Sequence, residues 1–316
     1  GGTNTVSSDL VLGRNSGSSG TYNLSGTGNL STNIQVVGNQ GTGSITQSGG
    51  TNTVSSALYL GYNSGGNGMY TMDNGNLSVG FDMYVGGSEW GVGGAGTFTM
   101  SGGQAGITNN LQVWDTGIVN LSGGTLTAGT IDNTNGGAFN VTGGTLAVDT
   151  FHGNLSITDT ILAPGNSPGT TSVFGDYSMD LDSTLQIEIG GLLAGTEFDV
   201  LDVSGIMDLG GTLEVLLYGG FNPDAGDTFD ILNWGSLTGM FDFLVMPTLL
   251  GDLFWDTSAL YTTGELSVGS QPVPEPGTIA LLGIGLAGLG GVYLRRRRRE
   301  KQNFTAKSQR TQKNLR

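Results

Sequence analysis

The sequence predicts an all-β protein: a right-handed parallel β-helix, or solenoid, of short Gly-rich repeats, with a β cap region and then one C-terminal transmembrane helix. Three observations predict this architecture. A glycine-led unit recurs every 20 to 28 residues in the first half of the chain. Apolar and polar residues alternate within each unit with the period of a strand. One uncharged stretch near the C-terminus runs directly into five consecutive arginines.

Residues 1–150 are predicted to form the β-helix repeats. The segment Gly1–Ser8 returns unchanged as Gly49–Ser56. A shorter unit also recurs in this part of the chain, with Gly at its first position, an aromatic or aliphatic residue at its third, and Gly or Asn at its last. Its starts are separated by steps of 23, 25, 28, 21 and 20 residues. The glycines that start the units are Gly20, Gly43, Gly68, Gly96, Gly117 and Gly137.

Each unit suits one coil of a parallel β-helix, because it holds two or three short strands with Gly-rich corners. In the first unit Tyr22 and Leu24 should face one side of a strand, and Asn23 and Ser25 the other. Stacking then places an apolar column inside and a Thr, Ser and Asn column outside. Such repeats resemble the β-strand repeats of autotransporter passengers and related surface proteins. A β-sandwich or propeller built from similar hairpins is the alternative.

Residues 151–270 are predicted to be a β-rich cap, similar to the end of a passenger. The repeat fades after Phe151, and Ala163–Gly169 is a turn-rich break. Longer alternating strands follow. We expect this region to finish the β-helix and cover its last coil, because an exposed strand edge invites aggregation. The predicted strands are 184–189, 198–203, 212–217, 228–232 and 260–268.

Residues 271–299 combine Pro274-Glu275-Pro276, an uncharged segment at 278–294 and a block of arginines. As a helix, residues 278–294 would reach about 25 Å, slightly less than a hydrocarbon core of about 30 Å. A basic block beside such a span should stay on the cytoplasmic side of the membrane. The arginines that are predicted to set this topology are Arg295, Arg296, Arg297, Arg298 and Arg299.

These three parts, in this order, resemble the PEP-CTERM sorting signal of exported bacterial proteins. The resemblance implies recognition by a membrane-embedded exosortase, which is expected to cut near the Pro-Glu-Pro motif. Proteins with this signal usually stop soon after the arginines, whereas here a polar, basic tail, predicted to be disordered, occupies residues 300–316. A buried core helix and an uncleaved single-pass anchor are the alternatives for residues 278–294.

Charge is divided sharply along the chain. Arg14 is the only basic residue before Arg295, and residues 1–294 carry a net charge of about −24. Residues 295–316 carry about +9. An acidic outer part repels nucleic acid, so no nucleic-acid partner is expected. The absence of cysteine excludes disulfides, thiolate metal sites and cysteine nucleophiles.

Residues that could carry out chemistry are few. His152 is the only histidine and is expected on a turn or the surface. Carboxylates could support glycoside hydrolysis by acid and base catalysis, and Asp180 and Asp182 would share a strand face. Neither calcium β-roll nor EF-hand spacing is present. We therefore expect no catalytic residue, metal site or cofactor. The carboxylate sets considered are Asp176, Asp180 and Asp182, and Asp199 with Asp202.

The sequence therefore predicts an exported, non-enzymatic structural or adhesion protein of the cell surface or extracellular matrix. Its predicted partners are exosortase and the inner membrane, where it is anchored at least transiently, and exopolysaccharide or other surface components. Because the sequence starts at Gly1 rather than Met, export would mean that a signal peptide has been removed or that the sequence is a fragment. The alternatives are a glycoside hydrolase-type enzyme on a β-helix and an uncleaved, single-pass membrane-anchored β protein.

Overall fold

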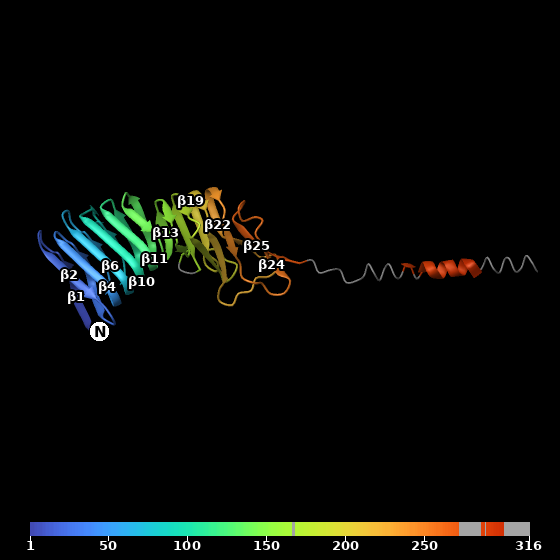
Figure 1. Cartoon of the computed structure of the whole chain (residues 1–316), viewed down its shortest axis with the longest axis horizontal. Coiled ribbons are helices and arrows are strands. Elements are labelled where there is room, and N and C mark those ends of the chain that lie inside the picture. The colour runs from blue at the N-terminus through green and yellow to red at the C-terminus, as the bar shows by residue number, and fades with distance from the viewer. Residues whose placement is uncertain (166–167, 272–285, 288, 300–316) are drawn as a thin grey trace, which may run out of the picture. The chain divides into compact units, whose positions relative to one another are not determined.

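A computed structural model describes residues 1–165, 168–271, 286–287 and 289–299 of the chain. Two compact units are present, Gly1–Ser270 and Gln271–Arg316. The first unit contains every described strand, and Figure 1 shows these strands stacked in chain order from β1 onward. The described part of the second unit is helical at residues 286–287 and 289–299. The all-β prediction for the body of the protein is confirmed.

Twenty strands of the first unit form one sheet, and every pairing within it is parallel. They are β1 (Thr3–Leu12), β2 (Ser19–Leu24), β3 (Asn29–Val37), β4 (Thr42–Val54), β5 (Leu58–Leu60), β6 (Asn67–Val79), β7 (Met83–Val85), β10 (Ala95–Trp114), β11 (Gly117–Asn135), β12 (Ala138–Val141), β13 (Thr145–His152), β14 (Leu155–Ile157), β15 (Ile161–Leu162), β16 (Thr170–Phe174), β17 (Tyr177–Met179), β18 (Thr184–Ile189), β19 (Val200–Leu209), β20 (Thr212–Leu217), β22 (Leu232–Gly239) and β23 (Phe243–Val245).

The glycine that starts each unit sets the register between coils. Parallel pairing aligns Gly20 with Gly43, and the same column continues through the starts of the next three units. Each step of the repeat is therefore one coil of the stack. The aligned starts are Gly20, Gly43, Gly68, Gly96 and Gly117.

A close approach of backbones explains why these positions are glycine. A Cβ on Gly68 would overlap the carbonyl oxygen of Val37 and the amide nitrogen of Gly61. A Cβ on Gly96 would overlap the carbonyl oxygen of Leu60 and the amide nitrogen of Gly86. Only a residue without a side chain lets each coil start against the strand that ends the coil before it.

The sheet closes on itself because its long strands bend. Tracing the pairings from β3 through β4, β6, β10, β7 and β5 returns to β3. Within β10, register shifts separate residues 95–107, which pair with β6, from residues 111–113, which pair with β7. Such irregularities turn a strand from one face to the next. The closed sheet surrounds an apolar core, and Phe98 at its centre is fully buried.

The stacked-coil arrangement predicted by the repeats is present, and its predicted right-handedness stays a prediction. Parallel pairing also continues past residue 150, where the repeat fades in the sequence. β11 pairs with β13, β13 with β16, β16 with β19 and β19 with β22. The predicted division between residues 1–150 and 151–270 is thus not a gap in the sheet.

Two small antiparallel sheets complete the first unit. One joins β21 (Thr228–Asp230), β25 (Glu265–Ser270) and β24 (Leu253–Asp256). Phe229 of this sheet is fully buried, with its ring centroid 5.9 Å from that of Trp255 and 5.4 Å from that of Phe198. The other sheet is a hairpin of β8 (Gly87–Ser88) and β9 (Gly91–Val92). The strand expected at 260–268 begins only at Glu265, because residues 260–263 form turns.

Candidate functional site

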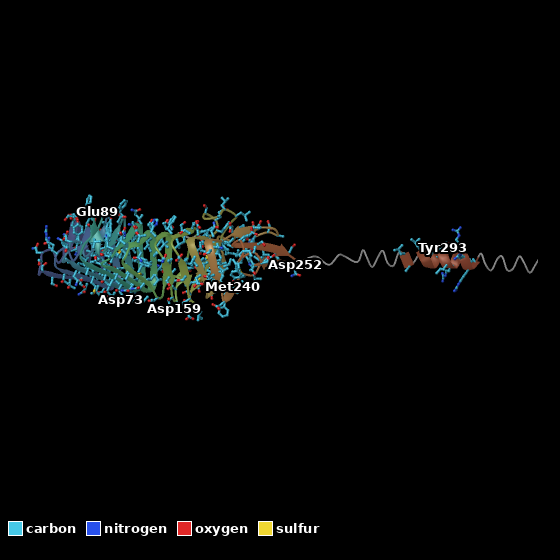
Figure 2. All side chains as sticks on the ribbon, turned by 90° about the horizontal axis from the view of Figure 1, so that it is seen from above. Asp73, Glu89, Asp159, Met240, Asp252 and Tyr293 are labelled. Carbon is cyan, nitrogen blue, oxygen red and sulfur yellow. The ribbon has the colours of Figure 1, made fainter. Side chains whose placement is uncertain are left out.

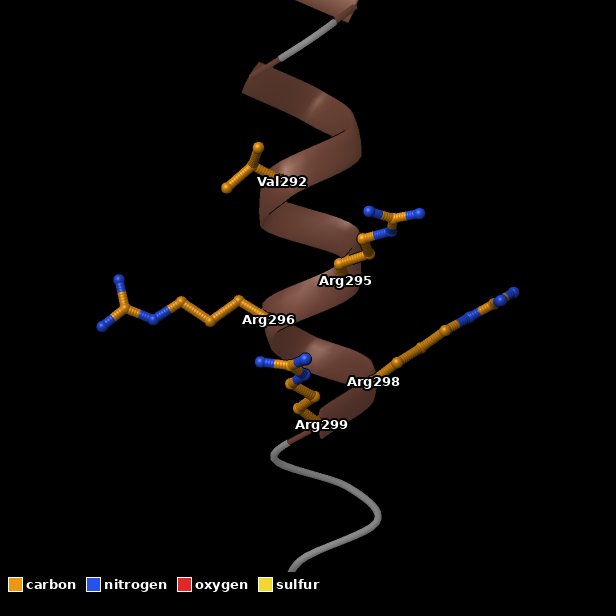
Figure 3. A pocket seen from close by; sticks show the side chains of 5 residues that line it. All are labelled: Val292, Arg295, Arg296, Arg298 and Arg299. Atoms are coloured by element: carbon orange, nitrogen blue, oxygen red, sulfur yellow. The ribbon is translucent and has the colours of Figure 1, made fainter.

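The arginine block lies on the helical segment of the second unit. Arg295–Arg299 are all exposed, and Figure 3 shows four of these side chains pointing away from the helix in different directions. The hollow that they line with Val292 is the open side of a helix rather than an enclosed cavity. Cationic side chains near the C-terminal end of a helix are favoured by its dipole.

Apolar side chains precede the arginines on the same helix and contact little else. Leu289 is 70% exposed and Val292 is 65% exposed. In water, such surface is unfavourable, at about 25 cal/mol for each Å² that is left unburied. The helix therefore carries an apolar stretch that is suited to apolar surroundings, followed directly by a cationic stretch.

Much of the predicted sorting signal falls outside the described residues. Pro274, Glu275 and Pro276 lie there, as do residues 278–285 and 288 of the predicted membrane helix 278–294, and the tail 300–316. Among the helical residues that the structure describes, none forms a helix that is long and apolar enough to cross a membrane.

The first carboxylate set does not share a strand face. Asp176 precedes β17, whereas Asp180 and Asp182 follow it in a turn, so the expectation that Asp180 and Asp182 share a strand face is wrong. Asp180 accepts a hydrogen bond from the Ser183 hydroxyl at 2.6 Å, and this bond is the main cause of its lowered pKa. Asp176 accepts a hydrogen bond from the backbone N–H of Ile206 at 2.8 Å. Asp176 thus joins its turn to the next coil, and Asp180 also accepts a hydrogen bond of 3.2 Å from the backbone N–H of Asp159 in the preceding coil.

The second carboxylate set is split between the inside and the outside of the stack. Asp199 is 1% exposed, whereas Asp202 on β19 is exposed to solvent. The Asp199 carboxylate accepts backbone N–H groups of Gly169 at 2.6 Å and of Glu188 at 2.7 Å. Burial raises the pKa of Asp199 to about 7, although these two donors favour the charged form. Asp199 thus joins the end of the turn-rich break to β18, a role that its sequence context did not indicate.

His152 and Arg14 occupy structural positions. His152 is the last residue of β13, and its ring stacks on Phe174 of the next coil with centroids 5.0 Å apart. It is therefore partly exposed at the end of a strand, so of the two positions expected for it, a turn or the surface, the turn is not found. Arg14 is exposed, and its backbone carbonyl accepts a hydrogen bond from the Asn39 side chain at 3.2 Å.

Small polar side chains cover one outer face of the coils. Parallel pairing aligns Thr53 with Ser78, Ser78 with Gly106, and Gly106 with Thr127. Because Gly106 has no side chain, the face is hollowed there over a volume of about 290 Å³, with Asp149 at its margin. Burial raises the pKa of Asp149. Among the described residues, no three His, Asp or Glu side chains are grouped so that they could hold a metal ion.

Comparison with known families identifies the C-terminal segment. A family model described as the PEP-CTERM protein-sorting motif matches residues 272–298. No curated protein matches the chain. The match does not extend to the repeats, so their similarity to autotransporter passengers stays a prediction. The motif implies an exported protein that is sorted to the cell envelope or surface by an exosortase, a membrane protease. The chain thus carries a PEP-CTERM protein-sorting motif, directly after a β unit that ends at Ser270.

Proposed function

We propose that this protein is a non-enzymatic structural or adhesion component of the cell surface or extracellular matrix. It is held at least transiently in the inner membrane by residues 278–294. The observation that carries the proposal is the sorting motif at 272–298, placed directly after a compact β unit that ends at Ser270. This order allows a membrane protease to separate the β unit from its anchor without cutting into the sheet.

The helical residues before the arginines support transient anchoring. Leu289, Val292 and Leu294 are each more than 60% exposed, and transfer into hydrocarbon would remove that apolar surface from water. The uncharged sequence 278–285 extends the same stretch toward the Pro-Glu-Pro motif. The five arginines after it would hold the C-terminal end in the cytoplasm.

The β unit supports a passive, structural role. Its carboxylates at Asp176, Asp180 and Asp199 accept hydrogen bonds from neighbouring coils or turns, which is what a scaffold requires. Its outer faces carry columns of small hydroxyl and amide groups, as in the hydrogen bond of 2.9 Å that Asn140 donates to Asn120. Repeated polar groups on a rigid stack offer an extended surface for exopolysaccharide or other surface components.

Expression of the full chain with and without an exosortase tests the proposal. With the enzyme, we expect a shortened protein at the cell surface or in the medium. Without it, the full-length protein should stay in the inner membrane. The matched variants are Glu275→Ala, which alters the motif, and Glu265→Ala, which alters a nearby carboxylate on β25.

Only Glu275→Ala should reproduce the result of the strain that lacks the enzyme. Full-length protein in the inner membrane of both strains would leave an uncleaved single-pass anchor and would contradict the sorting part of the proposal. Cleavage of a glycan panel by the purified protein, abolished by Asp202→Asn, would contradict the non-enzymatic part.

A further inference from the structure

One coil differs from its neighbours by an inserted hairpin. The step from Gly68 to Gly96 is 28 residues, the longest in the repeat. The extra length is the β8–β9 hairpin at 87–92, whose turn consists of Glu89 and Trp90. Insertions in a repeat array map to loops on one face, and that face is often the binding face.

Trp90 at the hairpin tip is strongly exposed. Its exposed fraction of 85% is the highest of any large apolar side chain that the structure describes. The hairpin beneath it is fixed, because Trp114 of the next coil donates an indole hydrogen bond of 3.1 Å to the Ser88 carbonyl. An exposed indole on an inserted hairpin is a suitable contact for a partner, because Trp combines a large apolar ring with a polar N–H group.

A stack of two tyrosines lies beside the hairpin; Tyr59 is buried, with 8% of its surface exposed, and Tyr84 is partly exposed. Tyr59 and Tyr84 are aligned in adjacent coils by the β5–β7 pairing, and their rings stack with centroids 5.1 Å apart and an angle of 7° between planes. Tyr62 packs against Tyr59 edge to face at 4.9 Å. The same column carries Gln112, Asp132 and His152 in later coils.

Carboxylates border these rings. Tyr84 donates a hydrogen bond of 3.0 Å to Asp82. Burial raises the pKa of the Tyr59 hydroxyl, and the nearby Glu89 carboxylate raises it further. Glu89 projects from the outer edge of the stack, as Figure 2 shows. The surface thus combines the exposed indole of Trp90 and the partly exposed ring of Tyr84 with carboxylate hydrogen-bond acceptors.

We propose that Trp90, Tyr84 and Glu89 form a binding site for a neutral polysaccharide. A pyranose ring has an apolar face of C–H bonds, which fits the electron-rich face of an aromatic ring. Its hydroxyl groups donate to carboxylates, and such charge-assisted hydrogen bonds are strong. The site rests on the proposed function in one respect, since export brings the β unit to extracellular glycans.

The charge of the surroundings selects a neutral ligand. Arg14 is the only Lys or Arg in residues 1–270, so the β unit offers few cations that could pair with a uronate or sulfate group. Glu89 and Asp82 would repel such anions. A protein partner would use the same exposed indole, but it would not be displaced by free oligosaccharides.

Binding of neutral oligosaccharides to the full chain in a detergent without a sugar headgroup tests the site. The probes are hexasaccharides of β-1,4-glucan, β-1,3-glucan, α-1,4-glucan and β-1,4-mannan, with oligogalacturonate as the anionic comparison. Calorimetry and tryptophan fluorescence report binding. We expect at least one neutral probe to bind and oligogalacturonate not to bind.

Variants assign the binding to the hairpin. Trp90→Ala should weaken binding at least tenfold, and Glu89→Gln should weaken it severalfold. Phe243→Ala is the matched control, because Phe243 is 63% exposed on β23 and should leave binding unchanged. Equal melting temperatures of all three variants would show that folding is preserved.

Three outcomes would overturn the site: no binding of any neutral probe, equal binding by Trp90→Ala, or tighter binding of oligogalacturonate. Sorting separates this inference from the proposed function. If Trp90→Ala and the unchanged chain are both sorted normally and neither binds glycan, the site is wrong and the surface role stands. If the unchanged chain binds glycan but is not sorted, the site stands and the surface role is wrong.

Discussion

The interior of the stack differs between its early and its later coils. In the early coils, Gln35, Gln47 and Asn52 point inward and are fully buried. In the later coils, counted from β6 onward, the aligned inner positions are apolar: Asn52 is followed by Leu77, and Gln47 by Met72. The backbone register is the same in both regions. The comparison teaches that this register fixes which positions face inward, but not whether they must be apolar.

The early coils tolerate polar residues because each amide finds partners. Gln35 donates to Asn52 at 2.6 Å, and Asn52 donates to the Tyr70 hydroxyl at 2.9 Å. Tyr70 in turn donates to Gln47, whose amide donates to the carbonyl of Asn76 at 2.9 Å. A buried network whose members are satisfied is stable, whereas a partly satisfied one is costly. Buried hydroxyls without a hydrogen-bond partner among the described residues occur in both regions, on Thr32 in the early coils and on Tyr177 in the later coils.

The largest predicted loss of stability concerns the aligned glycines that start the units, which both regions contain. Gly96→Ala should lower the free energy of unfolding by about 3 kcal/mol or more, because its Cβ would overlap backbone atoms that cannot move aside. Gly68→Ala, at the aligned position one coil earlier, should lower it by a similar amount. Denaturant unfolding measures both. The control is Gly106→Ala in the same strand as Gly96, where a Cβ meets nothing within 4 Å. Equal losses at Gly96 and Gly106 would show that backbone crowding does not explain the repeat.

The next effect separates the two regions. Asn52→Ala should lower the free energy of unfolding by about 2 to 3 kcal/mol, because it leaves the buried Gln35 amide without its partner and removes the donor to the Tyr70 hydroxyl. Replacing Gln35, Asn52 and Gln47 by Leu together with Tyr70→Phe should cost less, since the side chains of the network are removed together and only the carbonyls of Gly50 and Asn76 lose a donor. Urea unfolding of the single and the combined variants tests this. A combined variant that loses more than Asn52→Ala would contradict the view that pairing decides the cost.

Two buried tyrosines provide a smaller, matched test. Tyr70→Phe should destabilise the protein by about 1 to 2 kcal/mol, because its hydroxyl bridges Asn52 and Gln47. Tyr177→Phe should stabilise it by about 1 kcal/mol, because it removes a buried hydroxyl without a partner. The measurement is the denaturant midpoint at an unchanged slope. The same sign for both variants would contradict the view that hydrogen-bond pairing decides the cost of a buried hydroxyl.

The smallest effect at neutral pH concerns Asp199 in the later coils. Its folded pKa of about 7 lies above the ordinary value of 3.8, so the folded state binds the proton more tightly than the unfolded state. The stabilisation by the protonated form is present below about pH 4 and is lost as the pH rises to about 7. Asp199→Asn should abolish this loss of stability with rising pH. At pH 7 the substitution should lower the free energy of unfolding by only about 1 kcal/mol, because one hydrogen bond is lost.

The difference between the two unfolding curves, measured from pH 4 to pH 8, isolates this group from the other carboxylates. A difference that does not change with pH would mean that Asp199 is ionised throughout this range. Asp202→Asn is the matched control, because Asp202 is exposed on the same strand and should show no such difference.

Several features were predictable because they repeat. The glycines at Gly20, Gly43 and Gly68 were identified by spacing, and they are aligned in the sheet because a corner that excludes a side chain recurs once in each coil. The arginine block could also be predicted, because a run of charged residues next to an uncharged segment is recognised from the local sequence alone. The 28-residue step was visible too, and it was the available signal for the hairpin that carries Trp90.

Other features depended on neighbours that are distant in sequence. Gln35 meets Asn52, and Asp199 meets Gly169, across separations of 17 and 30 residues. Asp180 and Asp182 were assigned to a strand by alternation, but the turn after β17 places them elsewhere. Periodicity cannot show where a turn interrupts it.

The amino-acid sequence by itself determined the length of each coil, the glycine corners, the division of charge and the sorting motif at 272–298. Only the tertiary structure decided which polar side chains lie inside the stack, that Asp199 is buried while Asp202 is exposed, and that Tyr59 stacks on Tyr84. The physical reason is that a side chain in a stack has its main neighbours one coil away. A bulge or turn between them changes the face on which it lies.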